Sequence, residues 1–201
     1  FSTISIERNN ILLVLDNRNQ STRSIDQIYS NALNKNDYNF DLWDCYYNGE
    51  IDRPVLEKYT NKTVIWVSSS YFTSYVTHNN ATRDVLKEYL NNGGNIFLSS
   101  NFLTSYFHKE LKKYLFYEIL NENINLNDIS GIEDDVITNN ITFKIFNTRK
   151  LADEITPISP AQSILSYQNS NADSTASAGL RLETEKYKLV LLPFAFDEIE
   201  S

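Results

Sequence analysis

The stretch that decides the fold is Lys62–Ser100, KTVIWVSSSYFTSYVTHNNATRDVLKEYLNNGGNIFLSS. An apolar, β-branched run, Val64–Val67, leads into polar residues, and a segment with helical spacing, Asn80–Leu90, follows them. Gly93-Gly94 then separates this segment from a second apolar run, Ile96–Leu98. The pattern predicts one strand–helix–strand unit, and therefore a parallel sheet with functional loops at the ends of its strands.

The same alternation continues on both sides of this unit. We expect further strands at Asn10–Asp16 and Phe40–Cys45, and helices at Ser21–Asn36, Asp52–Leu56 and Lys109–Leu120. Ser21 or Thr22 and Asp52 are suitable N-caps, and Gly93-Gly94 is a suitable helix stop.

After Leu120 the alternation of predicted strands and helices ends. Asn121–Asn127 is polar and is expected to form a loop, and Asn169–Ser177 is expected to form a mobile loop. Strands are predicted at Ile141–Phe146, Gln162–Tyr167, Ala178–Leu182 and Leu189–Phe194. Together the segments predict a three-layer α/β fold, flavodoxin-like over its first ~120 residues, with a mostly parallel sheet and a mixed or antiparallel C-terminal extension.

Composition is that of one folded domain spanning residues 1–201, since 41% of the residues are hydrophobic and 13% are aromatic. The net charge of −8 argues against nucleic acid and anionic membrane surfaces as partners. No apolar run approaches the ~18 residues that cross a bilayer, so no direct membrane insertion is expected. Cys45 is the single cysteine, which excludes an intrachain disulfide and a multi-cysteine metal site.

The chain contains no Met and begins at Phe1, so we expect a processed form or a fragment of a longer protein. N-x-S/T sequons occur at Asn19, Asn61, Asn80 and Asn140. They are compatible with an exported glycoprotein, although an Asn- and Ser/Thr-rich chain contains such sequons by chance.

With these segments placed, the chain resembles the class I glutamine amidotransferase-like domain, in the version that large secreted or cell-surface proteins of bacteria and archaea carry as an accessory domain, some secreted metallopeptidases among them. The matching motifs cover nearly the whole chain. They are ILLVLD at 11–16, VIWVSS at 64–69, LKEYLNNGGNIFLSS at 86–100, AQSILSYQ at 161–168, SAGLRL at 177–182 and YKLVLLPFAFDEI at 187–199.

The resemblance implies a catalytic cysteine on a glycine-flanked turn after a strand, with a histidine and a glutamate near the last strand. In such a triad the thiolate attacks an amide, the imidazole transfers the proton and the carboxylate orients the imidazole. This chain instead reads Ser99-Ser100-Asn101-Phe102 at the turn and Phe194-Ala195-Phe196-Asp197-Glu198 near the end. We therefore expect no amidotransferase activity and no cofactor.

Two sets of candidate residues remain. Ser99 or Ser100 could act as a nucleophile with His108, with Asp16 or Asp197 as third member; the alternative is that they are loop and capping residues. His78 lies in the loop after the Val64–Val67 strand.

Asp16 and Asp197, at strand ends, could bind a metal ion, and so could the acidic turn Glu133-Asp134-Asp135. Asp41, Asp44 and Glu198 are further carboxylates near strand ends, and the alternative for all of these residues is that they are capping or solvated carboxylates. Cys45 is most simply a core residue, and the aromatic side chains of 106–117 are core or a partner surface.

The sequence thus predicts a non-catalytic structural or interaction domain of an exported multidomain surface protein. Its expected partners are neighbouring domains or other surface-protein subunits. The alternatives are a serine-dependent amidase or esterase and a carbohydrate- or metal-binding module. In the family that the chain resembles, a helix follows the last strand and covers one face of the sheet. Because this chain reaches Ser201 where that helix would begin, we expect another segment or subunit to cover that face, and the isolated chain to be less stable or prone to self-associate.

Overall fold

The computed structural model describes residues 9–17, 23–68, 76, 79–101, 107–146, 152–168, 176–196 and 199, and at residues 23, 24, 107–110 and 123 it describes the backbone alone. The described helices are α1 (Arg23–Lys35), α2 (Cys45–Asn48), α3 (Arg53–Leu56), α5 (Asn80–Asn91), α6 (Phe107–Leu115) and the 3₁₀ helix η1 (Glu57–Tyr59). The strands are β1 (Ile11–Leu15), β2 (Phe40–Asp44), β3 (Thr63–Ser68), β4 (Asn95–Ser100), β5 (Tyr117–Ile124), β6 (Asp128–Gly131), β7 (Thr142–Lys144), β8 (Ala152–Pro157), β9 (Gln162–Tyr167), β10 (Gly179–Glu183) and β11 (Lys188–Leu192).

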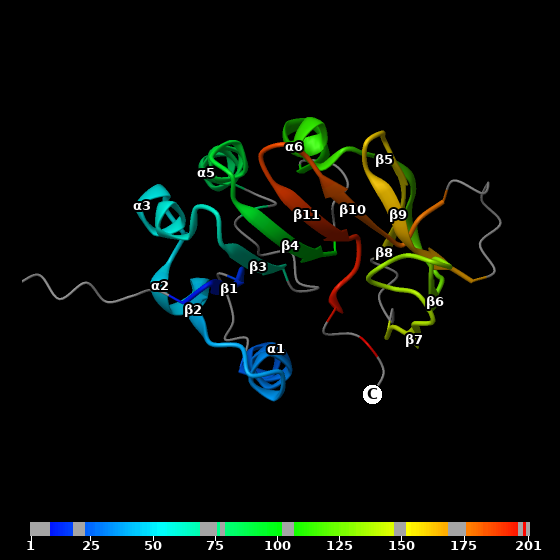
Figure 1. The fold of residues 1–201 in the computed structure, drawn as a ribbon, viewed down its shortest axis with the longest axis horizontal. Coiled ribbons are helices and arrows are strands. Elements are labelled where there is room, and N and C mark those ends of the chain that lie inside the picture. The colour runs from blue at the N-terminus through cyan, green and yellow to red at the C-terminus, as the bar shows by residue number, and fades with distance from the viewer. Residues whose placement is uncertain are drawn as a thin grey trace, which may run out of the picture.

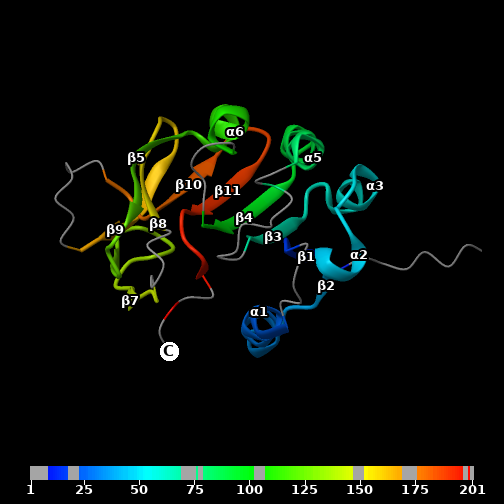
Figure 2. The same ribbon diagram turned by 180° about the vertical axis from the view of Figure 1, so that it is seen from behind.

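A nine-stranded sheet forms the body of the molecule, with strand order β2-β1-β3-β4-β11-β10-β9-β6-β7 (Figure 1). A separate two-stranded sheet pairs β5 with β8. The three longest described helices, α1, α5 and α6, lie on the half of the sheet that contains β1, β3, β4 and β11. The helices α5 and α6, with the short α3, lie on one face of the sheet, and α1 lies on the other (Figures 1 and 2).

The predicted strand–helix–strand unit is present as β3, α5 and β4. The two strands are adjacent and parallel, with Val64 opposite Ile96. Asn79 caps α5 by accepting a hydrogen bond from the backbone N–H of Ala81 at 2.9 Å. The helix ends where Gly93 adopts a positive φ of 91°, a conformation that glycine reaches without strain.

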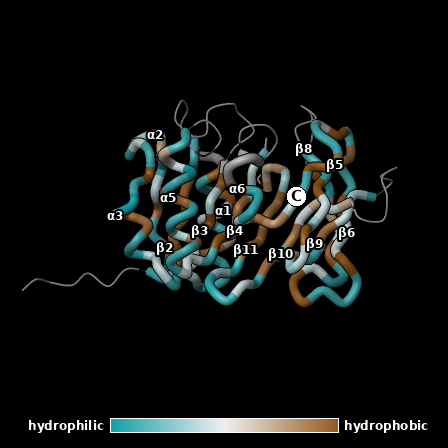
Figure 3. Tube along the Cα trace, turned by 90° about the horizontal axis from the view of Figure 1, so that it is seen from above, coloured by the Kyte–Doolittle hydropathy of each residue, from teal (hydrophilic) through white to brown (hydrophobic). Residues whose placement is uncertain are grey.

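The core has a layer on each face of the sheet. Trp66, Leu86 and Leu98 are fully buried between the sheet and the helices α5 and α6. On the opposite face Leu13 of β1 belongs to the same buried cluster as Tyr29 of α1. Figure 3 shows hydrophobic stretches along the central strands, whereas the outer helices alternate between hydrophilic and hydrophobic residues. This alternation is that of amphipathic helices covering a buried sheet.

The prediction of a three-layer, flavodoxin-like, mostly parallel sheet is wrong. Four pairings in the large sheet are parallel, β2–β1, β1–β3, β3–β4 and β4–β11. Four are antiparallel, β11–β10, β10–β9, β9–β6 and β6–β7. The antiparallel strands therefore form half of a large mixed sheet rather than an extension of a parallel one. Antiparallel strands need no crossover helix, which is why this half carries few helices.

The predicted helix Lys109–Leu120 is also wrong in its second half. α6 ends at Leu115, because Phe116 has a positive φ of 53° and the chain then enters β5. Strand β5 continues through most of the expected loop Asn121–Asn127 and pairs with β8. Buried Tyr117 anchors the new strand.

Other expectations differ in smaller ways. The strand Phe40–Cys45 ends at Asp44, and Cys45 begins α2. Strands β6 and β8 were not predicted, and β7 is shorter than the expected strand Ile141–Phe146. Most of the expected mobile loop, residues 169–175, lies outside the described residues. Among the helices of the described part, none is long and apolar enough to span a membrane.

Candidate functional site

The carboxyl ends of β1, β3 and β4 bring a group of polar residues to one edge of the sheet. Val67 and Ser99 are opposite each other, as are Ser68 and Ser100, and Asp16 follows directly after β1. Six polar residues that the structure describes at this edge are at most 1% exposed: Asp16, Asn17, Ser68, Ser99, Ser100 and Asn101. In parallel α/β sheets this edge is where ligands bind, so it is the candidate site.

Asp16 ties β1 to β3. Its Oδ2 atom accepts hydrogen bonds from the indole N–H of Trp66 at 3.0 Å and from the backbone N–H of Val76 at 2.9 Å. Its own backbone N–H donates to the carbonyl of Val67 at 2.8 Å. A carboxylate so occupied with protein donors acts as a structural link, and these contacts do not favour Asp16 as a metal ligand. No group of three or more potential metal-binding side chains exists among the described residues.

Ser99 links β4 to the segment after β11. Its hydroxyl donates to the carbonyl of Phe194 at 2.9 Å and accepts from the backbone N–H of Phe196 at 2.8 Å. The side chain is fully buried. A hydroxyl whose proton is given to a backbone carbonyl lacks the contact with a general base that activates a serine nucleophile.

Ser100 and Asn101 complete this link. The Ser100 hydroxyl donates to the backbone carbonyl of Asn101 at 2.7 Å. Asn101 accepts from the N–H of Ala195 at 2.7 Å through Oδ1, whereas its buried Nδ2 has no hydrogen-bond partner among the described residues. The sequence placed Asn101 at the turn, but it gave no reason to expect an unpaired amide donor there.

The histidine side chains fall outside the described part of the chain. His108 lies near the start of α6, but only its backbone is described. His78, Asp197 and Glu198 lie outside the described residues altogether. A pair formed by Ser99 or Ser100 with His108 therefore stays a prediction.

Cys45 is a core residue at the start of α2 and is 2% exposed. Burial raises the pKa of its thiol, and the charges of Asp16 and Asp44 raise that pKa further. The thiolate is therefore scarce at neutral pH, and with it the reactivity of the cysteine.

Asp41 and Asp44 make local contacts. Asp44 caps α2 by accepting from the N–H of Tyr46 at 2.9 Å. Asp41 accepts from the amide of Asn9 at 3.0 Å and from the hydroxyl of Tyr59. Both carboxylates thus have the capping or structural role that was one of the two sequence interpretations.

The three carboxylates of the acidic turn Glu133-Asp134-Asp135 are not grouped around a common metal position. Glu133 and Asp134 are exposed, whereas Asp135 is 8% exposed and forms an ion pair with Arg181 at 2.8 Å. The contacts of Asp135 are therefore with the protein, and they do not favour a calcium site.

The sequence reasoning missed a buried acidic pair on β8. Asp153 is fully buried and Glu154 is 2% exposed. Glu154 accepts from the amide of Asn121 at 2.6 Å, which joins β8 to β5. Burial, and then the charge of Asp153, raises the pKa of Tyr117. The only available signal was two consecutive acidic residues, which is equally typical of a solvated turn.

Comparisons with known proteins identify the fold but no family. No protein-family model and no curated protein matches the sequence. Among solved structures, the mmIFT52 N-terminal domain is similar with a TM-score of 0.58 and 14% identity, covering 94% of this chain and 88% of that chain. A putative ThuA-like protein from Bacteroides uniformis is similar with a TM-score of 0.55 and 10% identity, covering 97% of this chain and 86% of that one.

A further similarity is to part of a longer enzyme. An exo-β-1,4-mannosidase from an Opitutaceae bacterium matches with a TM-score of 0.59 and 11% identity, covering 92% of this chain but 31% of the mannosidase. The polyextremophilic β-galactosidase of Halorubrum lacusprofundi matches with a TM-score of 0.55 and 11% identity over 27% of its own length. At these identities the similarity concerns the fold alone.

Proposed function

We propose that this chain is a non-catalytic structural or interaction domain of a larger, exported or cell-surface protein. Its partners would be neighbouring domains of the same polypeptide or other subunits of the surface assembly. The resemblance to accessory domains of the class I glutamine amidotransferase type belongs to this proposal.

The observation that carries the proposal is the bonding of Ser99. Ser99 stands at the position where the resemblance implies a nucleophile. Its buried hydroxyl instead bonds to the backbone at Phe194 and Phe196, and so fastens the end of β4 to the end of β11. The position thus has a structural use, and a structural use requires neither an exposed hydroxyl nor a base.

Two further observations support a domain of a larger protein and its export, respectively. In the mannosidase and the β-galactosidase, the matching fold is less than a third of the chain, so this fold does occur as one part of longer proteins. The sequon residues Asn61, Asn80 and Asn140 are exposed, as an acceptor of an N-linked glycan must be.

A screen of amidase, esterase and glutaminase substrates tests the proposal against the hydrolase alternative. We expect no turnover by the wild-type chain above a buffer blank. Turnover that disappears in Ser99→Ala or Ser100→Ala, with the fold intact by circular dichroism, would overturn the proposal. Turnover that persists in both variants at a constant specific activity through purification would also overturn the proposal, because another residue of the chain would then be catalytic.

The metal-binding alternative is tested by calcium titration followed by thermal melting. A bound ion must raise the melting temperature, because it stabilises the folded state only. We expect no increase, since Asp16 and Asp135 bond to protein donors. An increase that is lost in Asp16→Asn would show that the candidate edge binds a cation after all.

A further inference from the structure

The outer side of β2 is a border of the large sheet. β2 is the first strand in the sheet order, and it pairs with β1 in continuous parallel register from Phe40 to Asp44. Among the described residues, no strand or isolated bridge pairs with its other side, which we call the open side of β2. The backbone N–H and C=O groups on that side form a template to which another extended chain can add.

The two border strands of the large sheet differ in how they resist such an addition. β7, at the opposite border, has three residues and includes Lys144, which forms an ion pair with Asp128 at 3.0 Å. A short strand and a lysine at the border both hinder pairing with another chain. β2 has five residues and contains no Lys and no Pro, and its register shows no bulge. The open side of β2 is therefore the better template of the two.

Exposed apolar and aromatic side chains surround the open side of β2. Leu42, in the middle of the strand, is 44% exposed, and Tyr38 before the strand is 57% exposed. In α2, which follows β2 directly (Figure 1), Tyr46 and Tyr47 are 45% and 61% exposed, and their rings meet edge to face with centroids 4.8 Å apart. Exposed aromatic groups that gather in this way are typical of a protein interaction surface.

The same surface is acidic. We call residues 36–52 the β2 flank, a stretch that contains no Lys, Arg or His. Lys35 precedes it, and Lys58 lines the small hollow beside β2. Negative charge is therefore in excess around the open side. The carboxylates of the β2 flank are Asp37, Asp41, Asp44, Glu50 and Asp52.

The hydrogen bonds that these carboxylates accept come from neutral donors. Asp41 and Glu50 accept from amide and hydroxyl groups, and Asp44 and Asp52 accept from backbone N–H groups. A neutral donor satisfies a carboxylate oxygen but leaves the negative charge in place. The β2 flank is therefore complementary in charge to a basic partner.

We propose that the open side of β2 binds an extended segment of a partner protein that carries Lys or Arg side chains. The segment adds to the sheet as a further strand through backbone hydrogen bonds, and its basic side chains lie on the face that carries Asp41. An opposite charge across neighbouring strands is favourable and a like charge is unfavourable. A second copy of this chain does not meet the requirement, because its net charge is −8 and its own β2 flank is acidic.

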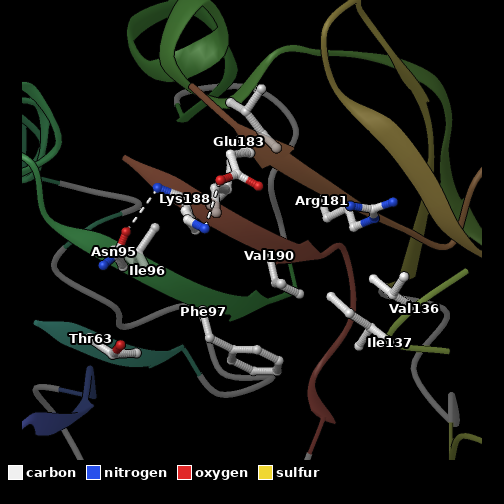
Figure 4. Close-up of a pocket in the computed structure, with 12 residues that line it drawn as sticks. Thr63, Asn95, Ile96, Phe97, Val136, Ile137, Arg181, Glu183, Lys188 and Val190 are labelled. Atoms are coloured by element: carbon white, nitrogen blue, oxygen red, sulfur yellow. Dashed lines mark hydrogen bonds and ion pairs between the residues drawn. The ribbon is translucent and has the colours of Figure 1, made fainter. Parts of the chain in front are cut away.

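The groove over β4 and β11 is less suitable for a basic segment. Figure 4 shows Lys188 beside Glu183 on the rim of the groove, and the two form an ion pair at 2.6 Å. The rim carboxylate is thus already neutralised within the chain. β4 and β11 also have a paired strand on both sides, so their backbones offer no template.

This inference deepens the proposed function and rests on it, since it gives the interaction domain a docking surface and a class of partner. NMR titration with a defined peptide tests it. The probe has about nine residues, is blocked at both ends and alternates Thr with Lys, so that it is basic and favours extended structure. We expect it to shift the amide signals of residues 40–44 and to slow hydrogen exchange at alternate residues of β2.

Two altered peptides separate charge from strand pairing. A peptide with Glu in place of Lys should not bind, because its charge is that of the β2 flank. A peptide that keeps the lysines but is N-methylated at alternate residues lacks the backbone donors. It should bind about fivefold more weakly or less, because it cannot complete the ladder of hydrogen bonds.

A matched pair of variants locates the site. Leu42→Lys should raise the dissociation constant of the basic peptide about fivefold or more, because a like charge then replaces an apolar contact. Leu120→Lys is the control, since Leu120 is 41% exposed on β5 in the other sheet. Its dissociation constant should equal that of the wild type, and circular dichroism should show both variants folded.

Four results would overturn the inference. They are no shift of the β2 amides at millimolar peptide, equal binding of the N-methylated or the acidic peptide, unchanged affinity in Leu42→Lys, and the same amide shifts when the chain alone is concentrated. The last result would assign the open side of β2 to a second copy. None of the four concerns turnover, so the substrate screen still decides separately whether the chain is catalytic.

Discussion

Ser99 bonds to two backbone groups of the segment that follows β11. In Ser99→Ala the buried carbonyl of Phe194 and the N–H of Phe196 both lose this contact. We expect the free energy of unfolding to fall by about 1–3 kcal/mol, because unpaired buried polar groups are costly.

Urea denaturation measures this change. Ser130→Ala is the control, since the Ser130 hydroxyl accepts one bond from the exposed amide of Gln168 and should cost much less. Equal stability of Ser99→Ala and the wild type would contradict the structural role of Ser99.

Asp135 makes the stability of the folded state depend on pH. Burial raises the pKa of this carboxyl, but the hydrogen bonds from Ile137, Arg181 and Thr138 outweigh burial and lower the pKa below its ordinary value of 3.8. A lowered pKa in the folded state means that the ionised form adds stability above pH 3.8, and that this stability is lost as the pH falls through the folded value.

We therefore expect Asp135→Asn to lower the melting temperature at neutral pH, and the difference from the wild type to shrink as the pH falls below 3.8. The exposed neighbour gives a matched control, because Asp134 has a φ of 63°, which Asn also tolerates. Asp134→Asn should leave the melting curve nearly unchanged at each pH. A constant Asp135→Asn difference from neutral to acidic pH would show that the carboxylate charge is not what holds the loop.

At the scale of elements, the β6–β7 hairpin depends on one close backbone approach. A Cβ atom on Gly131 would lie 1.7 Å from the carbonyl oxygen of Thr138 and 2.6 Å from its carbon. Both are backbone atoms, so the loop itself must move to admit a methyl group.

Gly131→Ala should destabilise the protein by about 1–3 kcal/mol through this overpacking. It should also speed amide exchange at Ile137 and Thr138, whose N–H groups bond to Asp135. Hydrogen exchange followed by NMR measures both effects, with Ser130→Ala as the neighbouring control. Unchanged exchange at these two amides would mean that the loop accommodates the methyl group without opening.

The elements that the sequence predicted correctly are those with strong local signals. β3, α5 and β4 follow from an apolar run, a helical spacing and a glycine stop, all of which are local. β5 was missed because α6 is followed by aromatic and apolar residues that continue a helical pattern. What ends the helix is the backbone of Phe116 and the pairing of β5 with β8, a contact between distant segments.

The difference between local signals and contacts of distant segments also explains why the predicted fold class was wrong and why the site was predicted only in part. Strand–helix alternation does indicate parallel strands, but it cannot show that β11 pairs with β4 and then continues into antiparallel hairpins. At the candidate edge, the residue types of Asp16 and Ser99 were visible in the sequence. Their partners Trp66, Phe194 and Phe196 are distant in the chain, so the sequence could not show the structural role of the two side chains.

For the molecule as a whole, the carboxyl edge of the large sheet and the face that carries α1 have different roles. Its carboxyl edge is closed by bonds between the protein's own groups, from Asp16 to Asn101. Among the described residues, the α1 face instead has an open groove of about 400 Å³ over β4 and β11, which is lined in part by Phe97, Val136, Ile137 and Val190. Interaction with another macromolecule therefore fits the α1 face better than the edge, whose polar side chains are buried.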